Sequence, residues 1–211
     1  MPLDLPDDIH ELLVACLTTD ERARGERFRF ARDRRRFAAS RGALRQLIGS
    51  YLRLPPAAVW LRYGPHEKPY LCGRDGPTVQ FNLAHSDALA IAALTQKRAV
   101  GVDVELIRSE FVSDRLAAAI MSPAEIIRFR ALAPEKRAPA FFSIWTRKEA
   151  YLKARGLGLS LRPDGIDIAG SADLDLPAPA AGARLFGSAD GISARSRRRR
   201  DTPAPSLSQR A

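Results

Sequence analysis

The sequence predicts an α+β fold. Two blocks rich in good helix formers, residues 8–52 and 108–155, flank a segment at residues 59–105 whose short apolar and alternating runs are typical of strands. The 211 residues, 45% of them hydrophobic, are enough for a substantial core, either in one domain or in two small lobes. No apolar run approaches the roughly 20 residues of a membrane-spanning helix. We therefore expect a soluble globular protein.

Three helices are predicted before the first strand. Residues 8–17 place apolar side chains at helical spacing, and a second helix begins at residues 19–22 with a capping residue and early acids. A third helix, from about Asp33 to Leu52, is expected to turn five side chains toward the core: Phe37, Leu44, Leu47, Ile48 and Tyr51. Its arginines and those of the second helix are expected to form a solvated face.

Short strands are predicted after residues 54–56 break the third helix. Residues 59–63 form the first, and the loop after it presents Lys68 beside a proline. Strands at residues 79–86 and 88–94 follow, with His85 and Ser86 where the first of them ends. A single histidine between strands more often satisfies local hydrogen bonds than performs catalysis, so both interpretations of His85 stay open at this point.

Two acidic residues share one side of the next strand. Residues 100–105 alternate with a period of two, so Asp103 and Glu105 point in the same direction. Adjacent carboxylates repel each other by several tenths of a kcal/mol unless a positive group lies between them. The pattern therefore predicts a cation or an arginine close to this strand.

The second helical block ends in the most informative stretch of the chain. Residues 108–137 are predicted to be helical with a restart at Ser122, and residues 141–153 form a helix that glycines at 156 and 158 end. A short strand is expected near residues 165–168. From about residue 169, Ala, Pro, Gly and Ser dominate and four arginines stand in a row, which predicts disorder.

Trp145, Glu149 and Lys153 recur every four residues and share one face of the last helix. Glu149 and Lys153 could form an ordinary surface ion pair that stabilises the helix by about 0.3–0.5 kcal/mol. Alternatively, Glu149 could join the two strand carboxylates in an oxygen-ligand set suited to Mg²⁺, completed by water and phosphate oxygens.

The formal net charge of +10 indicates an acidic partner: nucleic acid, a phosphorylated cofactor or an acidic protein. Residues 192–211 carry six arginines and one aspartate, so half of this charge belongs to the tail. Cys16 and Cys72 have no metal-ligand spacing, and the first residues lack the pattern of a secretory signal. These observations predict a zinc-free cytoplasmic protein.

Several segments together resemble a known family. Gly101-Val102-Asp103-Val104-Glu105 and Trp145-Thr146-Arg147-Lys148-Glu149-Ala150-Tyr151-Leu152-Lys153 resemble the paired motifs of 4′-phosphopantetheinyl transferases. Residues 67–69, residues 81–86 and the arginine-rich helices that end near Arg41 resemble the larger, surfactin-synthetase-activating type. The resemblance covers roughly residues 18–168, with the segments in the right order.

The resemblance implies a role for each matched residue. Asp103, Glu105 and Glu149 would hold Mg²⁺, or Mn²⁺, against the diphosphate of coenzyme A, and Glu149 would also act as the base for a serine hydroxyl. Lys153 and His85 would complete the catalytic set by contacting phosphate. The residues implied to bind coenzyme A are Arg24, Arg41, Lys68, His85, Ser86 and Lys153, with Arg41 on the 3′-phosphate.

The resemblance also implies an architecture and partners. It indicates two similar lobes related by a pseudo-twofold axis, each a small antiparallel sheet with a long helix, with the active site between them. We expect lobes at residues 1–98 and 99–170 and a disordered tail at 171–211. The partners would be coenzyme A and an acyl or peptidyl carrier protein that docks near residues 111–132, with Phe111 and Met121 exposed; no membrane or specific nucleic acid is expected, and the protein would be a monomer.

Two alternatives remain at this stage. A transferase-like protein could bind coenzyme A or a carrier without turnover, because Met1 opens almost directly into a helix and the last forty residues have low complexity where family members usually have strands. A basic nucleic-acid-binding protein would also explain the charge, although no recognised binding motif is present and few aromatic residues lie among the arginines.

Overall fold

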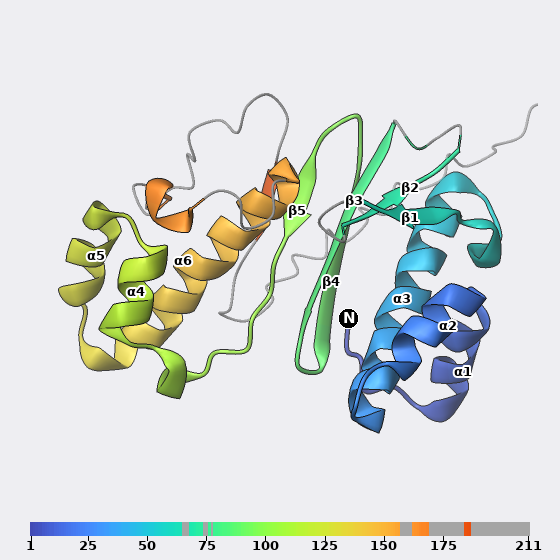
Figure 1. Ribbon diagram of the computed structural model, residues 1–211, viewed down its shortest axis with the longest axis horizontal. Helices are drawn as coiled ribbons and strands as arrows, with labels where there is room; N and C mark the ends of the chain where they lie inside the picture. Colours follow the sequence, from blue (N-terminus) through green and yellow to red (C-terminus); the bar gives the residue numbers. More distant parts are fainter. Residues whose placement is uncertain (65–67, 74–75, 77, 157–161, 169–183, 187–211) are drawn as a thin grey trace, which may run out of the picture.

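The computed structural model describes residues 1–64, 68–73, 76, 78–156, 162–168 and 184–186 (Figure 1). The expected disorder of residues 171–211 lies outside the described residues, apart from 184–186, which form a strand. The fold is α+β, as the sequence predicts. Among the described residues, no helix is both long and apolar enough to cross a membrane.

The elements of the first half are the helices α1 (Asp7–Ala15), α2 (Thr19–Glu26) and α3 (Ala31–Leu52), the 3-10 turn η1 (Pro56–Ala58) and the strands β1 (Leu61–Tyr63), β2 (Pro69–Leu71), β3 (Val79–Ser86) and β4 (Leu89–Gln96). The second half contains β5 (Val100–Val102), η2 (Ser109–Phe111), α4 (Asp114–Ile120), α5 (Pro123–Arg130), α6 (Pro134–Arg155), η4 (Pro163–Gly165) and β6 (Arg184–Phe186). Figure 1 shows α1–α3 on one side of the long β3–β4 hairpin and α4–α6 on the other.

The first half is built on α3. Its apolar side chains pack against the small antiparallel sheets β1–β2 and β3–β4 in a core formed by Leu44, Ile48, Val59, Leu71, Val79 and Phe81. Helix α1 lies directly on α3, because a Cβ atom on Gly42 would be 2.4 Å from the carbonyl oxygen of Leu13. The two helices can approach this closely only with glycine at position 42.

The β3–β4 hairpin gains a short extra strand-like segment from the start of the chain. Leu3 N donates to Ala88 O and Ala90 N donates to Met1 O, at 2.8 and 2.9 Å. Helix α1 begins at Asp7, one residue before the predicted start, and the residues ahead of it extend the hairpin edge through a single bridge between Pro2 and Leu89. Strand β5, which lies beside the β3–β4 hairpin, pairs in parallel with β6.

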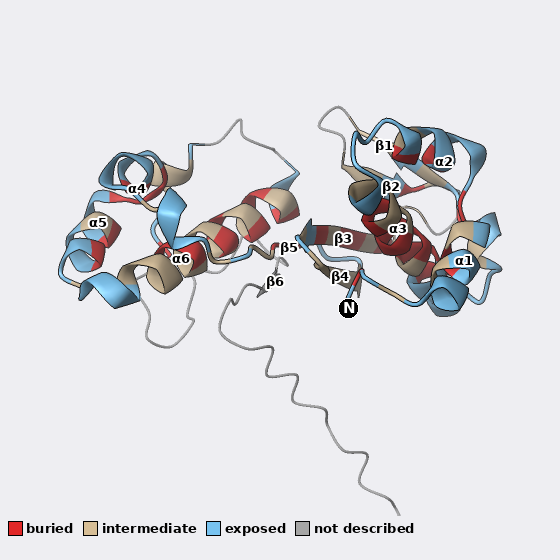
Figure 2. Cartoon of the chain, turned by 90° about the horizontal axis from the view of Figure 1, so that it is seen from below, coloured by how far each residue is buried: buried red, intermediate tan, exposed pale blue. Residues whose placement is uncertain are grey.

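The second half has its own core, formed between α4, α5 and α6 by Ala117, Ile120, Met121, Phe129, Phe141 and Phe142. Helix α6 also packs on β5, and the contact is tight: a Cβ atom on Gly101 would lie 1.9 Å from Ala150 O. Figure 2 shows buried residues along α6. Gly101 therefore sets how closely the last helix approaches the strand that leads to Asp103.

Some positions differ from the sequence predictions. Leu47 and Tyr51 are 43% and 50% exposed, although their helical spacing puts them on the same side of α3 as the buried Leu44 and Ile48. Three arginines on the buried side are not solvated: Arg36, Arg41 and Arg45. Each long side chain takes part of the space that an apolar residue would otherwise fill.

The second half shows further differences. Residues 163–165 form a 3-10 turn, and the expected strand at 165–168 is absent from the described chain, because Ile168 N donates to the Glu125 side chain at 2.8 Å. Met121 is fully buried in the core, whereas Phe111 is 57% exposed. The helical block predicted at 108–137 starts only at Asp114, after a single 3-10 turn.

Candidate active site

An acidic centre lies where β5 ends against α6. Asp103 follows the last residue of β5 and is buried, and Glu149 and Lys153 come from α6, one turn apart. Lys153 Nζ donates a hydrogen bond to Asp103 Oδ1. The predicted face of α6 therefore points at the predicted strand, and Lys153 pairs with Asp103 rather than forming a surface pair with Glu149. Trp145, on the same face, packs instead into the core of the second half.

The surroundings of this centre disfavour the charged form of two of its carboxylates, Asp103 and Glu149. Burial raises the pKa of Glu149, and the charges of Asp103 and Glu105 raise it further, against the opposite effect of Lys153. Burial likewise raises the pKa of Asp103, with Lys153 opposing the shift. Glu149 therefore lies close enough to Asp103 and Glu105 for their charges to repel it, and Lys153 is the cation that opposes this repulsion.

Two carboxylate oxygen atoms of the centre make no hydrogen bond within the described structure. Asp103 Oδ2 and Glu149 Oε1 are buried and accept no hydrogen bond from the described residues. Such atoms are rare because each loses its hydration without replacement. No three His, Cys, Asp or Glu side chains in the described chain stand close enough to hold a metal ion by themselves. The residues fit an ion such as Mg²⁺, which takes one or two protein carboxylates and completes its shell with water and phosphate.

Glu105 is held by the end of β3. Ser86 Oγ donates to Glu105 Oε2 at 2.8 Å and accepts a hydrogen bond from Leu106 N at 3.1 Å. The neighbouring His85 side chain is exposed. Its pKa is lowered by partial desolvation and then by the positive charges of Lys153 and Arg41, while Glu105 raises it. His85 therefore lies between the acidic centre and a group of basic residues on α2 and α3.

Arg41 is the central member of this basic group. It is 6% exposed, and its Nε and Nη1 atoms have no hydrogen-bond partner among the described residues. Burial lowers the pKa of Arg41. Its guanidinium and that of Arg24 both lie over the ring of Tyr63, at 5.5 and 4.7 Å from the ring centroid. The Tyr63 hydroxyl is also buried and has no partner in the described structure.

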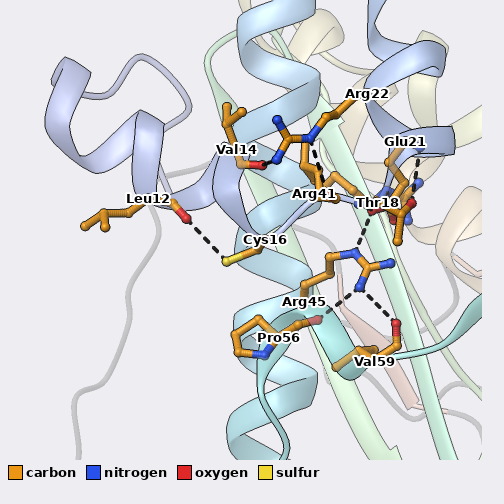
Figure 3. A network of polar contacts seen from close by, with 11 residues as sticks. Leu12, Val14, Cys16, Thr18, Glu21, Arg22, Arg41, Arg45, Pro56 and Val59 are labelled. Carbon is orange, nitrogen blue, oxygen red and sulfur yellow. Dashed lines mark hydrogen bonds and ion pairs between the residues drawn. The ribbon is translucent and has the colours of Figure 1, made fainter.

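A buried ion pair between Glu21 and Arg45 lies next to the basic group (Figure 3). Glu21 Oε2 accepts hydrogen bonds from Arg45 Nε at 2.6 Å and from the Thr18 backbone at 3.1 Å, and Arg45 also donates to two backbone carbonyls. Arg41 Nε is 3.8 Å from the other Glu21 oxygen, too far for a hydrogen bond. A cavity of about 490 Å³ opens beside this group and is lined in part by Arg24, Arg45 and Tyr63.

Lys68 connects the two halves. Its Nζ donates to the backbone carbonyl of Lys153, 2.5 Å away, in the last turn of α6. Burial lowers the pKa of Lys68. Helix C-terminal carbonyls lack partners within the helix and favour positive charge, so Lys68 stabilises that turn. In the described structure Lys68 thus holds the helix that carries Lys153.

The structure adds residues that the sequence analysis did not identify. Glu21 could be recognised as a capping residue, because Thr18 and Glu21 stand three apart, but its partner Arg45 lies 24 residues away and the sequence carries no sign of the pair. Tyr63 looked like an ordinary strand residue. Lys148, within the recognised motif, proves to be fully buried and paired with Glu125.

This arrangement defines a class of protein. Carboxylates with unsatisfied oxygens, a lysine and a histidine beside them, and a buried arginine without a full set of partners are the groups that an enzyme acting on a phosphorylated substrate needs.

Comparisons with known proteins agree. The family model described as 4′-phosphopantetheinyl transferase, N-terminal, matches residues 6–97, and the model of the 4′-phosphopantetheinyl transferase superfamily matches residues 99–193. The chain is 41% identical over 161 residues to the 4′-phosphopantetheinyl transferase HetI of a Nostoc species, covering 76% of this chain and 68% of that protein.

Two further relatives extend the similarity. A putative 4′-phosphopantetheinyl transferase of a Synechocystis species is 37% identical over 69% of this chain and 59% of its own length. A 4′-phosphopantetheinyl transferase of Bacillus subtilis is 25% identical over 78% of this chain and 73% of its own length. The chain therefore belongs to the 4′-phosphopantetheinyl transferase superfamily. Its members are transferases that use coenzyme A and act on carrier proteins.

Proposed function

We propose that this protein transfers the 4′-phosphopantetheine group of coenzyme A to a serine of an acyl or peptidyl carrier protein and releases 3′,5′-ADP. The proposal rests on one observation: the described part of the chain contains two sets of buried charged groups, one negative and one positive, with unsatisfied hydrogen-bonding atoms. Asp103 Oδ2 and Glu149 Oε1 accept no hydrogen bond from the described residues, and Arg41 Nε and Nη1 donate none to them. A metal-bound diphosphate that carries a second phosphate elsewhere satisfies both.

Asp103 and Glu149 would hold Mg²⁺, or Mn²⁺ in its place, against the diphosphate, and Glu105 would join them through a water molecule. When bound, the ion supplies neutralisation of the charge that develops on the phosphate oxygens. Lys153 then has a second role: once Asp103 is occupied, its ammonium lies beside the charge that grows on the departing 3′,5′-ADP. His85 and Ser86 would contact phosphate at the end of β3, and Arg41 with Arg24 would receive the 3′-phosphate.

The chemical step is a displacement at phosphorus. The serine oxygen forms a new bond to the β-phosphorus of coenzyme A while the bond from that phosphorus to the ADP oxygen breaks. Glu149, directly or through a water molecule, accepts the hydroxyl proton. The raised pKa of Glu149 makes it a better base than an exposed glutamate. Such a displacement depends mainly on alignment and charge stabilisation, which these residues supply.

The carrier would dock on the second half near residues 111–132. Phe111 and Ile127 are 57% and 72% exposed there, and they replace Met121, which is buried, as the apolar candidates. Basic side chains would favour encounter with an acidic carrier. We further propose that residues 1–98 and 99–170 are the two lobes of a pseudo-twofold pair, and that the protein acts as a cytoplasmic monomer.

Intact-mass spectrometry tests the proposed function. An apo carrier protein is incubated with this protein, coenzyme A and Mg²⁺, with a chelator in the control. A metal-dependent gain of one phosphopantetheine unit on the carrier is expected. Binding of coenzyme A without any gain on several carriers would contradict transfer and favour a binding protein that has lost turnover.

A further inference from the structure

A buried ion pair on the far side of α6 has no part in the proposed chemistry. Lys148 and Glu125 are both 0% exposed, and Lys148 Nζ is 2.5 Å from Glu125 Oε2. Lys148 stands directly before Glu149 in the chain, and consecutive residues of an α-helix point about 100° apart. Lys148 therefore points toward α4 and α5, while Glu149 points toward Asp103.

Each partner of the pair also satisfies backbone groups at the ends of other elements. Lys148 Nζ donates to the carbonyl oxygens of Ile120, at the end of α4, and Pro163, at 2.8 and 2.9 Å. Glu125 accepts from the backbone nitrogens of Ser122 and Ile168, both at 2.8 Å. The pair thus joins α6 to the end of α4, the start of α5 and the segment at residues 163–168.

We propose that Lys148 and Glu125 are positioning residues that fix the rotation of α6 and so aim Glu149 at the acidic centre. The inference rests on the proposed function. Gly101 sets the distance between α6 and β5, but a close approach of two backbones alone does not stop a helix from turning about its axis. Lys148 prevents this, because its ammonium is directed at three oxygen atoms from different segments.

The geometry gives the expected size of the effect. A helix with its side chains has a radius of about 5–6 Å, so a rotation of about 10° moves a side-chain end by about 1 Å. A displacement of about 1 Å in an active site can lower the rate about 100-fold. Residues that orient metal ligands typically change metal affinity or activity by about 10- to 100-fold when replaced.

The variant Lys148→Met tests the proposal, because methionine has a similar length and cannot donate to the three oxygens. Mn²⁺ binding is measured by calorimetry in the presence of coenzyme A, and transfer is measured well below the thermal midpoint of the variant. We expect Mn²⁺ affinity to fall about tenfold or more and kcat to fall about 100-fold. The KM for coenzyme A should rise less than kcat falls, because Arg41 and Arg24, in the other half, still bind the nucleotide.

Arg36→Met is the matched control. It breaks the ion pairs of a nearly buried arginine with Asp4 and Asp87 in the first half, and Arg36 has no role in the proposed binding of coenzyme A or metal. This variant should lose stability while its Mn²⁺ affinity stays at the wild-type value. If Lys148→Met behaves in the same way, with wild-type Mn²⁺ affinity and kcat, the positioning role is refuted.

A second variant decides the matter if Lys148→Met does not fold. Glu125→Gln keeps an acceptor oxygen but removes the charge that holds Lys148, and it should show the same losses in weaker form. Wild-type Mn²⁺ affinity in Glu125→Gln would overturn the proposal. A wild-type protein that binds Mn²⁺ and coenzyme A but never modifies a carrier would refute the proposed function, and the Mn²⁺ comparison would still test the role of Lys148.

Discussion

Replacing Gly101 by alanine should damage the acidic centre without touching any of its side chains. The added Cβ atom would stand 1.9 Å from Ala150 O and 2.5 Å from Ala154 N, both backbone atoms of α6. To restore the first contact to the 3.4 Å of ordinary van der Waals contact, the helix and strand must separate by about 1.5 Å. Ala150 and Ala154 already carry the smallest side chains that a helix normally uses, so no side chain can move aside.

The separation of α6 from β5 should lower both the stability of the protein and the rate of transfer, and the rate should fall more. Overpacking of this kind costs about 1–3 kcal/mol in the free energy of unfolding, and more where backbone must move. Glu149 moves with the helix while Asp103 stays with the strand, so a shift of more than 1 Å should lower transfer by at least about 100-fold. We therefore expect Gly101→Ala to remain largely folded at 20 °C and to be nearly inactive.

The assay combines thermal unfolding, followed by circular dichroism, with carrier modification followed by intact mass. Gly49→Ala is the control, because its Cβ atom would lie 2.7 Å from Leu54 O, a steric conflict distant in the fold from the acidic centre. It should lose stability and keep kcat. Wild-type kcat in folded Gly101→Ala would refute the reasoning, since it would show that the spacing between α6 and β5 does not set the geometry of the site.

Three other perturbations have clear expected outcomes. Glu149→Gln should abolish transfer yet raise the thermal midpoint of the metal-free protein at pH 8, because burial raises the pKa of that carboxyl; the gain should vanish below about pH 4.5, where the wild-type carboxyl is protonated in both states. An unchanged midpoint at pH 8 would contradict this. Arg41→Ala should weaken coenzyme A by at least about tenfold and dephospho-coenzyme A much less, measured by calorimetry, and equal losses would remove Arg41 from the 3′-phosphate site. Arg36→Met should lower the midpoint at pH 7, since hydrogen bonds from Arg36 lower the pKa of Asp4 and Asp87; the difference should shrink as the pH falls below about 3.8 through their folded-state values, and a difference that persists at pH 2 would argue against these ion pairs.

Much of the fold could be predicted because local signals decide it. Helix α2 begins at residue 19 as predicted, with Thr18 as its capping residue, and the capping serine and first-turn proline of α5 are found at the predicted places. Helix α6 begins seven residues before the predicted start, at Pro134, because proline fits the first turn and a second one, Pro139, is tolerated within the helix. The sequence could not show that tertiary packing outweighs this breaker.

The candidate site was predictable in part for a related reason. Four-residue spacing placed Glu149 and Lys153 on one face of α6, but β5 ends at Val102, so the predicted strand alternation does not extend to Asp103 and Glu105. Periodicity also carries no information on which elements meet. The burial of Arg41 and Arg45 was missed because helical spacing alone marks arginine as a surface residue. Only their partners, Glu21 and the ring of Tyr63, make burial possible, and those come from other segments.

The buried charges of the two halves also narrow what the protein binds. Arg36 and Arg45 have carboxylates at hydrogen-bond distance, so the high net charge of the chain partly serves internal pairs. Among the described residues Arg41 has none at that distance, and the unsatisfied atoms of the acidic centre are oxygens. A polyanion alone would provide the arginine with an anionic partner but would increase the repulsion at the carboxylates. A metal ion alone would neutralise the carboxylates but would leave the arginine without an anionic partner. A ligand that brings phosphate to Arg41 and a metal-bound diphosphate to Asp103 and Glu149 satisfies both, which favours a nucleotide with a separate 3′-phosphate over nucleic acid.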